Sequence, residues 1–367
     1  MVNSGEMGIW GKRDNMVVHE VEPYNAESPP QALAGRITPV DQFYGRNHAP
    51  IPQLDAENWR LRVEGLVGRP LEMSLDELRD RFPERSVEAT MQCAGNRRAD
   101  LMEVADIPGQ VPWGPGAIST ARWSGVSLAD VLAEAGVRPD AAHISFTGAD
   151  VSDQADPPQH FGGSIPMAKA TSHEVLLAWS MNGQSLPALH GAPLRVVVPG
   201  WIGARSVKWL LRIAVQAGPS DNYFQTEYSI LPPEADPHTA ERGEGITLGP
   251  VAIHCAILRP GKDARLPAGP TEVAGFAYAG DDRTVERVDV SADDGDTWTH
   301  AQVELPGSPW TWQHWHTTLD LPSGETELIA RAWDSTAAVQ PESPATVWNP
   351  RGYANNAAAR LHVTCRS

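Results

Sequence analysis

Prolines and glycines interrupt the chain so often that little room remains for long helices. The sequence of 367 residues contains 32 prolines and 32 glycines, spread along its whole length. Because proline cannot continue a helix and both residue types favour turns, this distribution predicts many short strands and loops with a few short helices. A chain of this length also exceeds one ordinary hydrophobic core, so we expect two domains.

The charge and hydropathy of the chain restrict its partners. The formal net charge is −17, which argues against a nucleic-acid-binding function. No stretch approaches the roughly 18 apolar residues that a transmembrane helix needs, and the first residues lack the apolar core of a signal peptide. We therefore expect a cytoplasmic protein without a membrane partner. A small anionic ligand would need a local basic pocket within this acidic molecule.

The pattern of residues changes after a charged segment at 229–245 that contains three prolines. Before this segment, capping residues and apolar spacing predict helices that begin after Ser74 and after Ser127. We expect residues 1–40 to wrap the surface and residues 150–163 to form a polar loop. Alternating or apolar runs predict strands at residues 59–67, 87–91, 143–147 and 194–198.

Beyond this segment, short alternating runs predict β-structure. Strands at residues 288–291 and 298–305 flank a turn at residues 293–296, which together indicate a hairpin. Strands at this spacing are typical of a β-sandwich. We therefore predict an α+β protein, with a mixed α/β domain in residues 1–242 and a β-sandwich in residues 243–367.

Two patterns in the second part of the chain imitate metal sites. The run Asp293–Asp296 resembles part of a calcium loop but lacks its distal glutamate, so we expect a hairpin turn. His314 and His316 would share one strand face in the aromatic run at residues 310–316, but no third ligand is evident. We therefore expect an aromatic strand at an interface.

Cys93 lies in a glycine-containing loop directly after a predicted strand and next to Arg97 and Arg98. Neighbouring positive charge favours the thiolate, which is the form that binds metals or attacks electrophiles. From these residues alone, Cys93 is a buried structural cysteine, a nucleophile with His190 as its base, or a metal ligand. The remaining cysteines lack the spacing of a disulfide framework or zinc site, and we expect two buried small hydrophobic residues, Cys255 and Cys365.

Four strings in the sequence distinguish among these interpretations. They are RNHAPIP at residues 46–52, MQCAGNRR at 91–98, HGAPLRVVVPGWIGARSVKW at 190–209 and WNPRGYANNA at 348–357. Together they resemble the sulfite oxidase family, which includes the molybdenum domains of sulfite oxidases and eukaryotic nitrate reductases. The resemblance extends over roughly residues 40–362.

The resemblance implies a molybdopterin cofactor, with Cys93 as the one protein ligand to molybdenum. It implies oxidation of sulfite to sulfate by oxygen-atom transfer, with electrons passed to an external acceptor such as dioxygen or cytochrome c. The second domain of the family is an immunoglobulin-like β-sandwich that dimerises, so we expect a homodimer. We expect no haem, because no cytochrome b5 domain precedes the resembling region in this sequence.

The family pattern places cofactor contacts in these strings and in one further loop. Arginine and lysine side chains there would supply charge-assisted hydrogen bonds to a pterin and its phosphate. The resemblance assigns this role to Tyr44, Arg46, Asn47, His48, Asp150, His190, Arg195, Ser206, Val207 and Lys208. For Asp150, either Asp153 or Asp156 could be the matching residue instead.

The resemblance also implies a substrate pocket built from arginines. It assigns Arg46, Arg98 and Arg351 to this pocket, with Trp113 and Tyr228 beside them. Guanidinium groups stay charged and offer paired donors to a small oxyanion such as sulfite. A few buried arginines can dominate the local field although the whole chain is acidic.

Two other functions remain as alternatives. A molybdenum-dependent reductase of nitrate or of an S- or N-oxide would use the same cofactor, but the three arginines and Tyr228 favour sulfite. A cofactor-free cysteine hydrolase or a binding module would contain no molybdenum. Metal analysis of the purified protein would separate this last class from the two enzymes.

Overall fold

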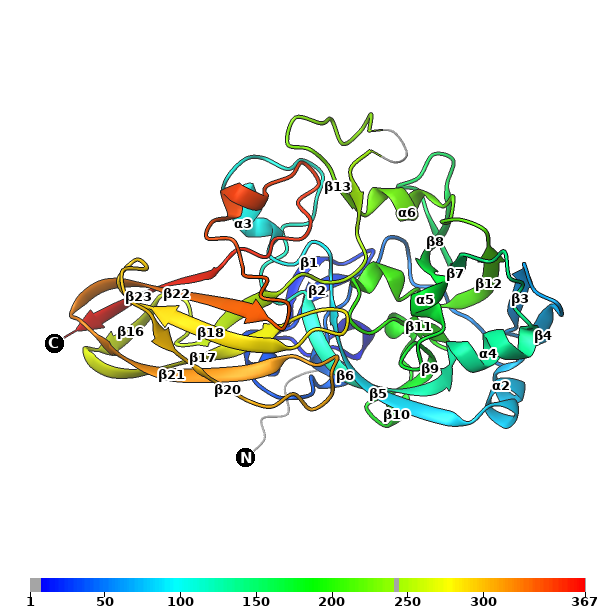
Figure 1. The fold of residues 1–367 in the computed structure, drawn as a ribbon, viewed down its shortest axis with the longest axis horizontal. Coiled ribbons are helices and arrows are strands. Elements are labelled where there is room, and N and C mark those ends of the chain that lie inside the picture. Colours follow the sequence, from blue (N-terminus) through cyan, green and yellow to red (C-terminus); the bar gives the residue numbers. More distant parts are fainter. Residues whose placement is uncertain (1–7, 241–243, 367) are drawn as a thin grey trace.

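The computed structural model describes residues 8–240 and 244–366, and the molecule is elongated (Figure 1). One end contains two sheets with short helices, and the other end is a β-sandwich that carries the C-terminus at its tip. The predicted α+β class and the β-sandwich are therefore confirmed. The predicted boundary between residues 242 and 243 falls outside the described residues.

Two five-stranded sheets form the first part of the chain. One has the order β10-β9-β6-β5, with β11 also paired to β9, and the other has the order β4-β3-β12-β7-β8. Apolar side chains from both sheets and from the helix α4 share one core. The strands are β3 (Leu61–Gly65), β4 (Leu71–Met73), β5 (Glu84–Gln92), β6 (Ile118–Ser127), β7 (His143–Ser152), β8 (Gln159–Pro166), β9 (Leu176–Met181), β10 (Gln184–Ser185), β11 (Arg195–Val197) and β12 (Leu210–Gln216).

Two of the helices begin where the sequence predicts. In α2 (Leu75–Arg81), Ser74 Oγ accepts from the Glu77 N–H and the Glu77 carboxylate accepts from the Ser74 N–H, which is the predicted capping box. The second helix, α4 (Leu128–Ala135), follows Ser127, but the predicted side-chain cap is wrong. Ser127 ends β6, and its buried Oγ has no hydrogen-bond partner among the described residues. The Leu128 N–H donates to a neighbouring carbonyl instead, at Val175.

The remaining helices are single turns between strands. Every described helix is too short or too polar to span a bilayer. They are α1 (Pro30–Leu33), α3 (Arg98–Met102), α5 (Met167–Ala170), α6 (Tyr223–Glu227) and the 3-10 turns η1 (Ile9–Gly11), η2 (Val40–Gln42), η3 (Ala188–His190), η4 (Gly203–Arg205) and η5 (Pro344–Val347).

The segment at residues 8–28, which we call the N-terminal strap, does more than wrap the surface. The strand β1 (Val17–Glu20) is largely exposed, but all three residues of β2 (Asn25–Glu27) are buried. Ala26 and Gly45 exchange two backbone hydrogen bonds of 3.0 and 2.9 Å. The surface position predicted for residues 1–40 holds for β1 but is wrong for β2, because β2 packs against the loop at residues 43–48.

Two strands occupy much of the segment that was predicted as a loop at residues 150–163. The strand β7 continues to Ser152 and β8 begins at Gln159, with Val151 paired opposite His160. A loop remains between the two strands, and Asp150 belongs to β7. The prediction failed because proline and polar residues mark the turn but do not limit the strands on either side.

The second part of the chain forms two packed sheets. Their orders are β15-β17-β21-β20 and β16-β23-β22-β18-β19, and Cys255 and Cys365 are buried in the core between them, as predicted. A small ladder of β13 (Ser229–Ile230) and β14 (Ile246–Thr247) precedes the sandwich. Its strands are β15 (His254–Arg259), β16 (Ala264–Pro267), β17 (Gly269–Tyr278), β18 (Val285–Ser291), β19 (Thr299–His300), β20 (Gln302–Val303), β21 (Gln313–Leu321), β22 (Gly324–Asp334) and β23 (Ala359–Arg366).

The predicted hairpin forms only in its first half. The strand β18 pairs with β19 around the turn, whereas β20 crosses to the opposite sheet and pairs with β21. The carboxylate of Asp293 accepts hydrogen bonds from the Ser291 hydroxyl at 2.7 Å and from the Thr297 N–H at 2.9 Å. This segment is therefore a turn held by its own side chains, as the sequence indicated.

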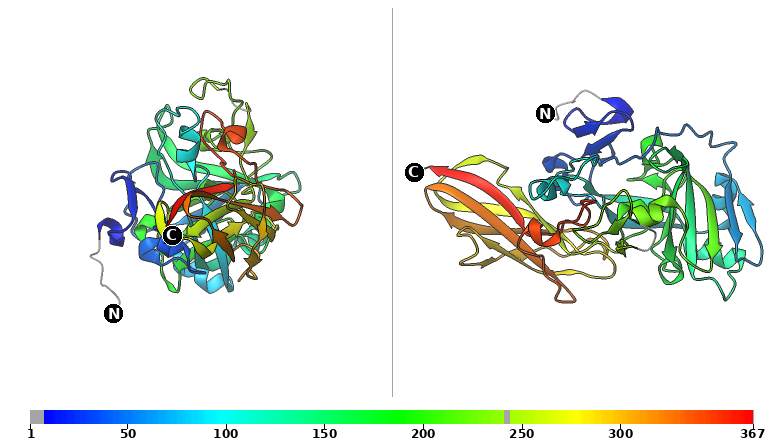
Figure 2. Two further views of the ribbon diagram at one scale, coloured as in Figure 1. Left: turned by 90° about the vertical axis from the view of Figure 1, so that its left-hand side faces the viewer. Right: turned by 90° about the horizontal axis from the view of Figure 1, so that it is seen from above.

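Figure 2 shows the two parts of the chain end to end in further views. The aromatic run at residues 310–316 contacts the first part through Trp312. The Trp312 N–H donates to Thr90 Oγ1 at 3.0 Å, and its indole N–H donates to the Arg36 carbonyl at 3.2 Å. The strand β21 begins only at Gln313. The run is therefore an interface within the chain, and half of it is loop.

Candidate active site

A cavity lies in the first part of the chain, among loops that follow strands. Cys93 reaches the cavity from the loop after β5, and the loop at residues 43–48 and the turns η3 and η4 supply other parts of its wall. The lining residues are Phe43, Tyr44, Gly45, Arg46, Asn47, His48, Met91, Cys93, Ala94, Asp150, Phe161, His190, Arg195, Gly203, Ala204, Ser206, Lys208 and Tyr228.

Cys93 lines this cavity and is 7% exposed. Its sulfur accepts a hydrogen bond from the Gly95 N–H at 3.4 Å, and its own N–H donates to the Ala117 carbonyl at 2.9 Å. Within residues 8–240 and 244–366, no group of three or more His, Cys, Asp or Glu side chains could hold a metal, and no histidine is hydrogen-bonded to this sulfur. The thiol therefore suits a metal that arrives with its other ligands, and a hydrolase would lack its base.

Two buried cations lie on the wall of the cavity. Arg195 donates to the carbonyls of His190 and Ser206, both at 3.0 Å, and burial lowers its pKa to about 10. Lys208 donates to the Arg46 carbonyl at 3.0 Å. Burial, and then the charge of Arg195, hold the pKa of Lys208 well below its ordinary value. An anion in the cavity would restore the full charge of Lys208.

Asp150 is the single acid among the described residues that line the cavity. Its Oδ1 is buried without a hydrogen-bond partner among these residues, and burial raises its pKa to about 6. Asp153 and Asp156 are exposed and lie outside the lining. Of the three aspartates that the sequence left open, the structure brings Asp150 to the cavity.

His48 and Tyr228 form an uncharged pair at the cavity wall. His48 Nε2 lies 2.6 Å from the Tyr228 hydroxyl, and His48 Nδ1 lies 3.1 Å from an Arg46 nitrogen. Burial, and then Arg46, hold the pKa of His48 well below its ordinary value. Burial also raises the pKa of Tyr228 well above its ordinary value. The pair can therefore offer a hydrogen bond to a ligand oxygen without carrying charge near neutral pH.

Arg98 lies beside the cavity rather than on its wall. It donates to the carbonyls of Val111 at 2.9 Å and Gly352 at 3.1 Å, and its guanidinium carbon lies 5.0 Å from the centre of the Tyr353 ring. A Cβ on Gly352 would come within 2.7 Å of the Arg98 side chain. Burial lowers the pKa of Arg98, although Tyr353 and Cys93 oppose this effect electrostatically. Its charge is therefore felt at Cys93.

Arg351 is already paired with a carboxylate that we did not predict. It donates to the Thr226 carbonyl at 3.0 Å and lies 3.2 Å from an oxygen of Glu227. Burial raises the pKa of Glu227, and Arg351 opposes this rise. Arg351 lies outside the lining, so of the three predicted arginines only Arg46 belongs to the described wall of the cavity.

Two other predicted residues are buried outside the lining. Trp113 is fully buried, with its ring 5.1 Å from that of His19 in an edge-to-face arrangement. Val207 packs in the apolar core, and its carbonyl accepts from the Val196 N–H at 2.8 Å. Neither side chain reaches the cavity wall.

The N-terminal strap contributes polar residues that the sequence analysis missed. Asn25 Oδ1 accepts the Asn47 N–H at 2.7 Å, and the Glu27 carboxylate accepts the Gly116 N–H at 2.8 Å in the loop that carries Trp113. The partners of the first contact are 22 positions apart in the sequence, and those of the second are 89 positions apart. No local spacing could have indicated them.

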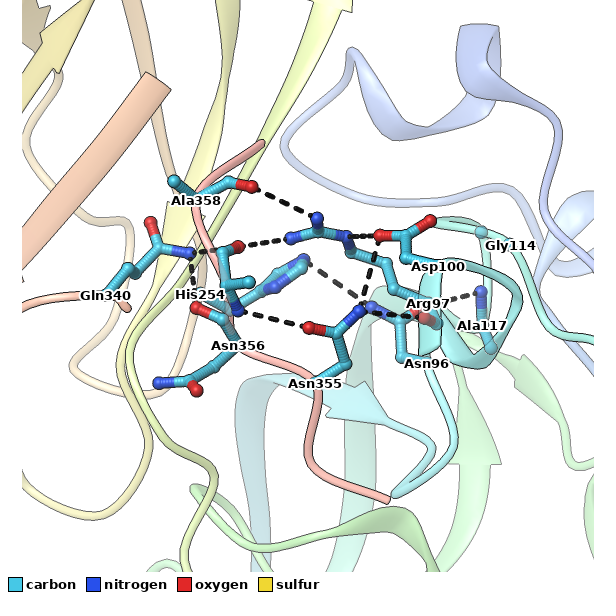
Figure 3. A network of polar contacts seen from close by, with 12 residues as sticks. Asn96, Arg97, Asp100, Gly114, Ala117, His254, Gln340, Asn355, Asn356 and Ala358 are labelled. Atoms are coloured by element: carbon cyan, nitrogen blue, oxygen red, sulfur yellow. Dashed lines mark hydrogen bonds and ion pairs between the residues drawn. The ribbon is translucent and has the colours of Figure 1, made fainter. Parts of the chain in front are cut away.

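The loop after Cys93 is tied to the second part of the chain (Figure 3). Arg97 donates to the carbonyls of Ala357 at 2.6 Å and Ala358 at 3.2 Å. Asn355 donates in return to the Arg97 carbonyl at 2.9 Å. The segment before β23 therefore holds the cysteine loop in place.

The residues at the cavity fit an anionic pterin cofactor. Arg46, Arg195 and Lys208 outnumber the one carboxylate, Asp150, and the unpartnered oxygen of Asp150 can accept from a ring N–H. Buried polar and charged groups are costly without partners, so a ligand with negative charge and hydrogen-bond donors would relieve this cost. Cys93 adds one sulfur for a soft metal.

Both parts of the chain match domain families. Residues 48–224 match the family model of the oxidoreductase molybdopterin binding domain, and residues 248–366 match that of the Mo-co oxidoreductase dimerisation domain. The two matches together cover both ends of the elongated molecule.

Relatives with similar sequences and structures extend these matches. Sulfite oxidase of Gallus gallus is 43% identical over 352 residues, which cover 93% of this chain and 76% of that protein. Sulfite oxidase of Arabidopsis thaliana is 37% identical, over 95% of this chain and 94% of that protein. The crystal structure of the sulfane dehydrogenase SoxCD from Paracoccus pantotrophus aligns with a TM-score of 0.79 at 31% identity, over 94% of this chain and 85% of that chain.

This chain spans 65% of the length of its mouse and human relatives, which are sulfite oxidases named as mitochondrial. The similarity nevertheless covers nearly all of the sequence described above, including the cysteine loop and the sandwich. The chain therefore belongs to the sulfite oxidase family of molybdopterin-dependent oxidoreductases.

Proposed function

We propose that this protein oxidises sulfite to sulfate at a molybdenum centre ligated by Cys93. The observation that carries this proposal is the position of Cys93 on the wall of a cavity whose buried cations outnumber its carboxylates. In the overall reaction, sulfite and water give sulfate, two protons and two electrons, and the electrons leave for an external acceptor. Dioxygen, a cytochrome c and another soluble carrier are the candidate acceptors.

The cofactor, when bound, supplies the metal that transfers an oxygen atom to sulfite and takes up two electrons. Cys93 would provide the protein ligand. The polar lining would orient the pterin and neutralise its phosphate, with charge from the cations and an acceptor from Asp150. The residues proposed for this role are Tyr44, Arg46, Asn47, His48, Asp150, His190, Arg195, Ser206 and Lys208, together with the backbone of Val207.

The substrate anion would bind on the side of the cavity near Tyr228. Arg46 lines this side and would contact the anion, while Arg98 would add positive charge from outside the lining. Arg351 would take part only indirectly, because it is paired with Glu227. The uncharged pair of His48 and Tyr228 would donate a hydrogen bond to an oxygen of sulfite. Trp113 would shape the pocket only through the loop that holds it.

The architecture and setting of the enzyme are also proposals. We assign catalysis to residues 1–242 and dimerisation to residues 243–367, and we infer a homodimer from the dimerisation-domain match. The cytoplasmic location and the lack of haem stay predictions from the sequence. Cell fractionation and an absorption spectrum of the purified protein would test them.

The first test is an assay of the purified holoprotein from a host that makes molybdopterin. We expect one molybdenum per chain and sulfite-dependent reduction of at least one acceptor in a panel of dioxygen, cytochrome c and ferricyanide. In parallel, nitrate reduction is measured with a reduced dye as donor. Nitrate turnover without sulfite turnover would establish the reductase alternative.

The second part of this test replaces the metal ligand. Cys93→Ser should abolish sulfite oxidation while circular dichroism shows a folded protein, because a neutral hydroxyl is a poor ligand for a soft metal. The matched control is Cys365→Ser, which changes a buried cysteine in the sandwich core and should leave turnover intact. Full activity of Cys93→Ser would refute the assignment of the ligand.

A further inference from the structure

Lys12 is a buried lysine that no motif in the sequence indicated. It belongs to the N-terminal strap and is 2% exposed. Its Nζ lies 2.6 Å from the Val40 carbonyl oxygen, 2.7 Å from the Phe43 carbonyl oxygen and 2.8 Å from His190 Nε2. Three acceptors thus surround the three N–H bonds of an ammonium, so the charged form is fully hydrogen-bonded in this position.

The neighbouring residue fastens this part of the strap. Arg13 Nε lies 2.6 Å from a carboxylate oxygen of Asp41, and the Arg13 N–H donates to the Asp41 carbonyl at 3.1 Å. The negative charge of Asp41 also favours the ammonium form of Lys12. Contacts from both the backbone and the side chain of Arg13 therefore hold the strap at the point where Lys12 enters the interior.

His190 connects Lys12 to the cavity. It lines the cavity, and its ring packs edge-on against Phe43 at 5.3 Å. Burial, and then the charge of Lys12, hold the pKa of His190 well below its ordinary value, so the imidazole is neutral. If Nε2 accepts a hydrogen bond from Lys12, the single ring proton must be on Nδ1. Lys12 and the His190 ring both interact with the Val40 carbonyl, and when Lys12 donates to Nε2, only Nδ1 of the ring can donate.

Lys12 also extends the group of cations behind the cofactor site. Arg195, Arg46 and Lys12 all act on Lys208, and each lowers its pKa. Burial lowers the pKa of Lys12 itself to about 7. An anion in the cavity would therefore favour proton uptake by these cations. Their titratable neighbours are Asp41, Asp150 and His190.

We propose that Lys12 is a positioning residue of the cofactor site, which holds His190 as an Nδ1–H donor and adds buried positive charge for an anionic pterin. This proposal rests on the proposed function, because it requires that the cavity binds molybdopterin. The strap is then part of the binding site, although Lys12 itself does not touch the cavity.

The experiment measures cofactor content rather than turnover. Variants are purified from a molybdopterin-producing host, and the pterin per chain is determined from the fluorescence of its oxidised form. Removal of a residue that orients a ligand-binding side chain typically weakens binding by about tenfold or more, so Lys12→Met should lose most of its pterin. Lys12→Arg keeps the charge and the donors and should recover much of it.

The matched control is another buried lysine. Lys169 in α5 is also nearly inaccessible and pairs with Glu174 at 2.6 Å, outside the cavity lining. Lys169→Met should lose stability but retain pterin. Equal pterin in Lys12→Met and the parent protein would overturn the proposal. Pterin loss that Lys12→Arg does not relieve, or that Lys169→Met matches, would also overturn it.

A second measurement needs no folded Lys12 variant. Nitrogen-15 spectra of the parent protein with labelled histidine report the tautomer of His190, which is assigned by comparison with His190→Gln. We expect the Nδ1–H form, and the Nε2–H form would refute the proposed orientation. Failure of the proposed function would appear differently, as a parent protein without pterin or molybdenum.

Discussion

Asp150 illustrates how single residues at the cavity are arranged for a ligand that must supply their partners. Its carboxylate oxygen is buried and unpartnered among the described residues, and Lys208 nearby favours its ionised form less than burial disfavours it. The pKa of Lys208 shifts in the opposite direction: burial lowers it and so favours the neutral amine. Burial therefore disfavours the charged form of both groups in the apoprotein. A ligand that brings negative charge to Lys208 and N–H donors to Asp150 would favour both charged forms.

The pH dependence of stability tests this state of Asp150. Its pKa is raised from 3.8 to about 6 in the folded apoprotein, so its contribution is fully present below about pH 4 and is lost as pH rises through about 6. Relative to Asp150→Asn, the parent apoprotein should lose roughly 2 kcal/mol between pH 4 and pH 7. Urea denaturation across this range measures the difference.

Asp153→Asn serves as the control for this measurement. Asp153 is exposed in the next loop, so its variant should follow the parent protein at every pH. A constant difference in unfolding free energy between Asp150→Asn and the parent would show that Asp150 ionises normally.

At the scale of single elements, the turn after β11 contributes both to the cavity wall and to the interface between the two parts of the chain. Its later residues, Gly203 and Ala204, line the cavity, whereas Gly200 contacts the second part of the chain. The Gly200 carbonyl accepts from the N–H groups of Val251 and Asp281, both at 3.0 Å. The beginning of this turn therefore belongs to the interface between the two parts, and its later residues belong to the cavity wall.

Gly200→Ala should therefore destabilise the protein without touching the cavity. Gly200 has a φ of +81°, and an added Cβ would lie 2.8 Å from Asp281 Cα. Backbone strain of this kind costs about 1–3 kcal/mol. Gly218→Ala is the control, because its Cβ would meet nothing within 4 Å. Chemical denaturation curves that coincide for the two variants would contradict the proposed contact.

For the whole molecule, the most important connection is the network in Figure 3. It joins residues 96–100, directly after the proposed metal ligand, to residues 355–358 in the second part of the chain. The second part of the chain is therefore coupled to the first, because residues 355–358, directly before β23, supply hydrogen-bond acceptors and donors to the cysteine loop.

Asn355→Ala tests this coupling between the two parts. Asn355 Nδ2 donates to the Arg97 carbonyl at 2.9 Å, and its Oδ1 accepts from the Ala357 N–H at 3.1 Å. Its loss leaves that buried N–H unpaired, at a cost of about 1–3 kcal/mol. We expect lower stability and lower sulfite turnover per bound molybdenum, since the cysteine loop would lose a fixed contact. Asn356→Ala is the control. Asn356 joins the network through its backbone carbonyl, which the substitution leaves in place, so this variant should retain both stability and turnover.

Local patterns in the sequence predicted those features that depend on neighbours along the chain. The capping box at Ser74, the sandwich and the strand before Cys93 are of this kind, and the structure confirms them. The roles of the family's site residues stay predictions, although most of these residues line one cavity.

Features that depend on distant partners could not be predicted from local patterns. Lys12 meets His190 across 178 positions, and Arg351 meets Glu227 only after the second part of the chain has docked. Ser127 has the residue type of a cap, but it is the last residue of β6 and its buried hydroxyl makes no hydrogen bond to the helix. Tertiary packing decided each of these cases.

The contacts of Arg97 have a consequence for the order of events during synthesis. The ribosome makes the cysteine loop well before residues 355–358, yet the side chain of Arg97 donates to two carbonyls of that later segment. The loop that presents the thiol therefore lacks these two anchors until residues 355–358 have been synthesised and have folded against it.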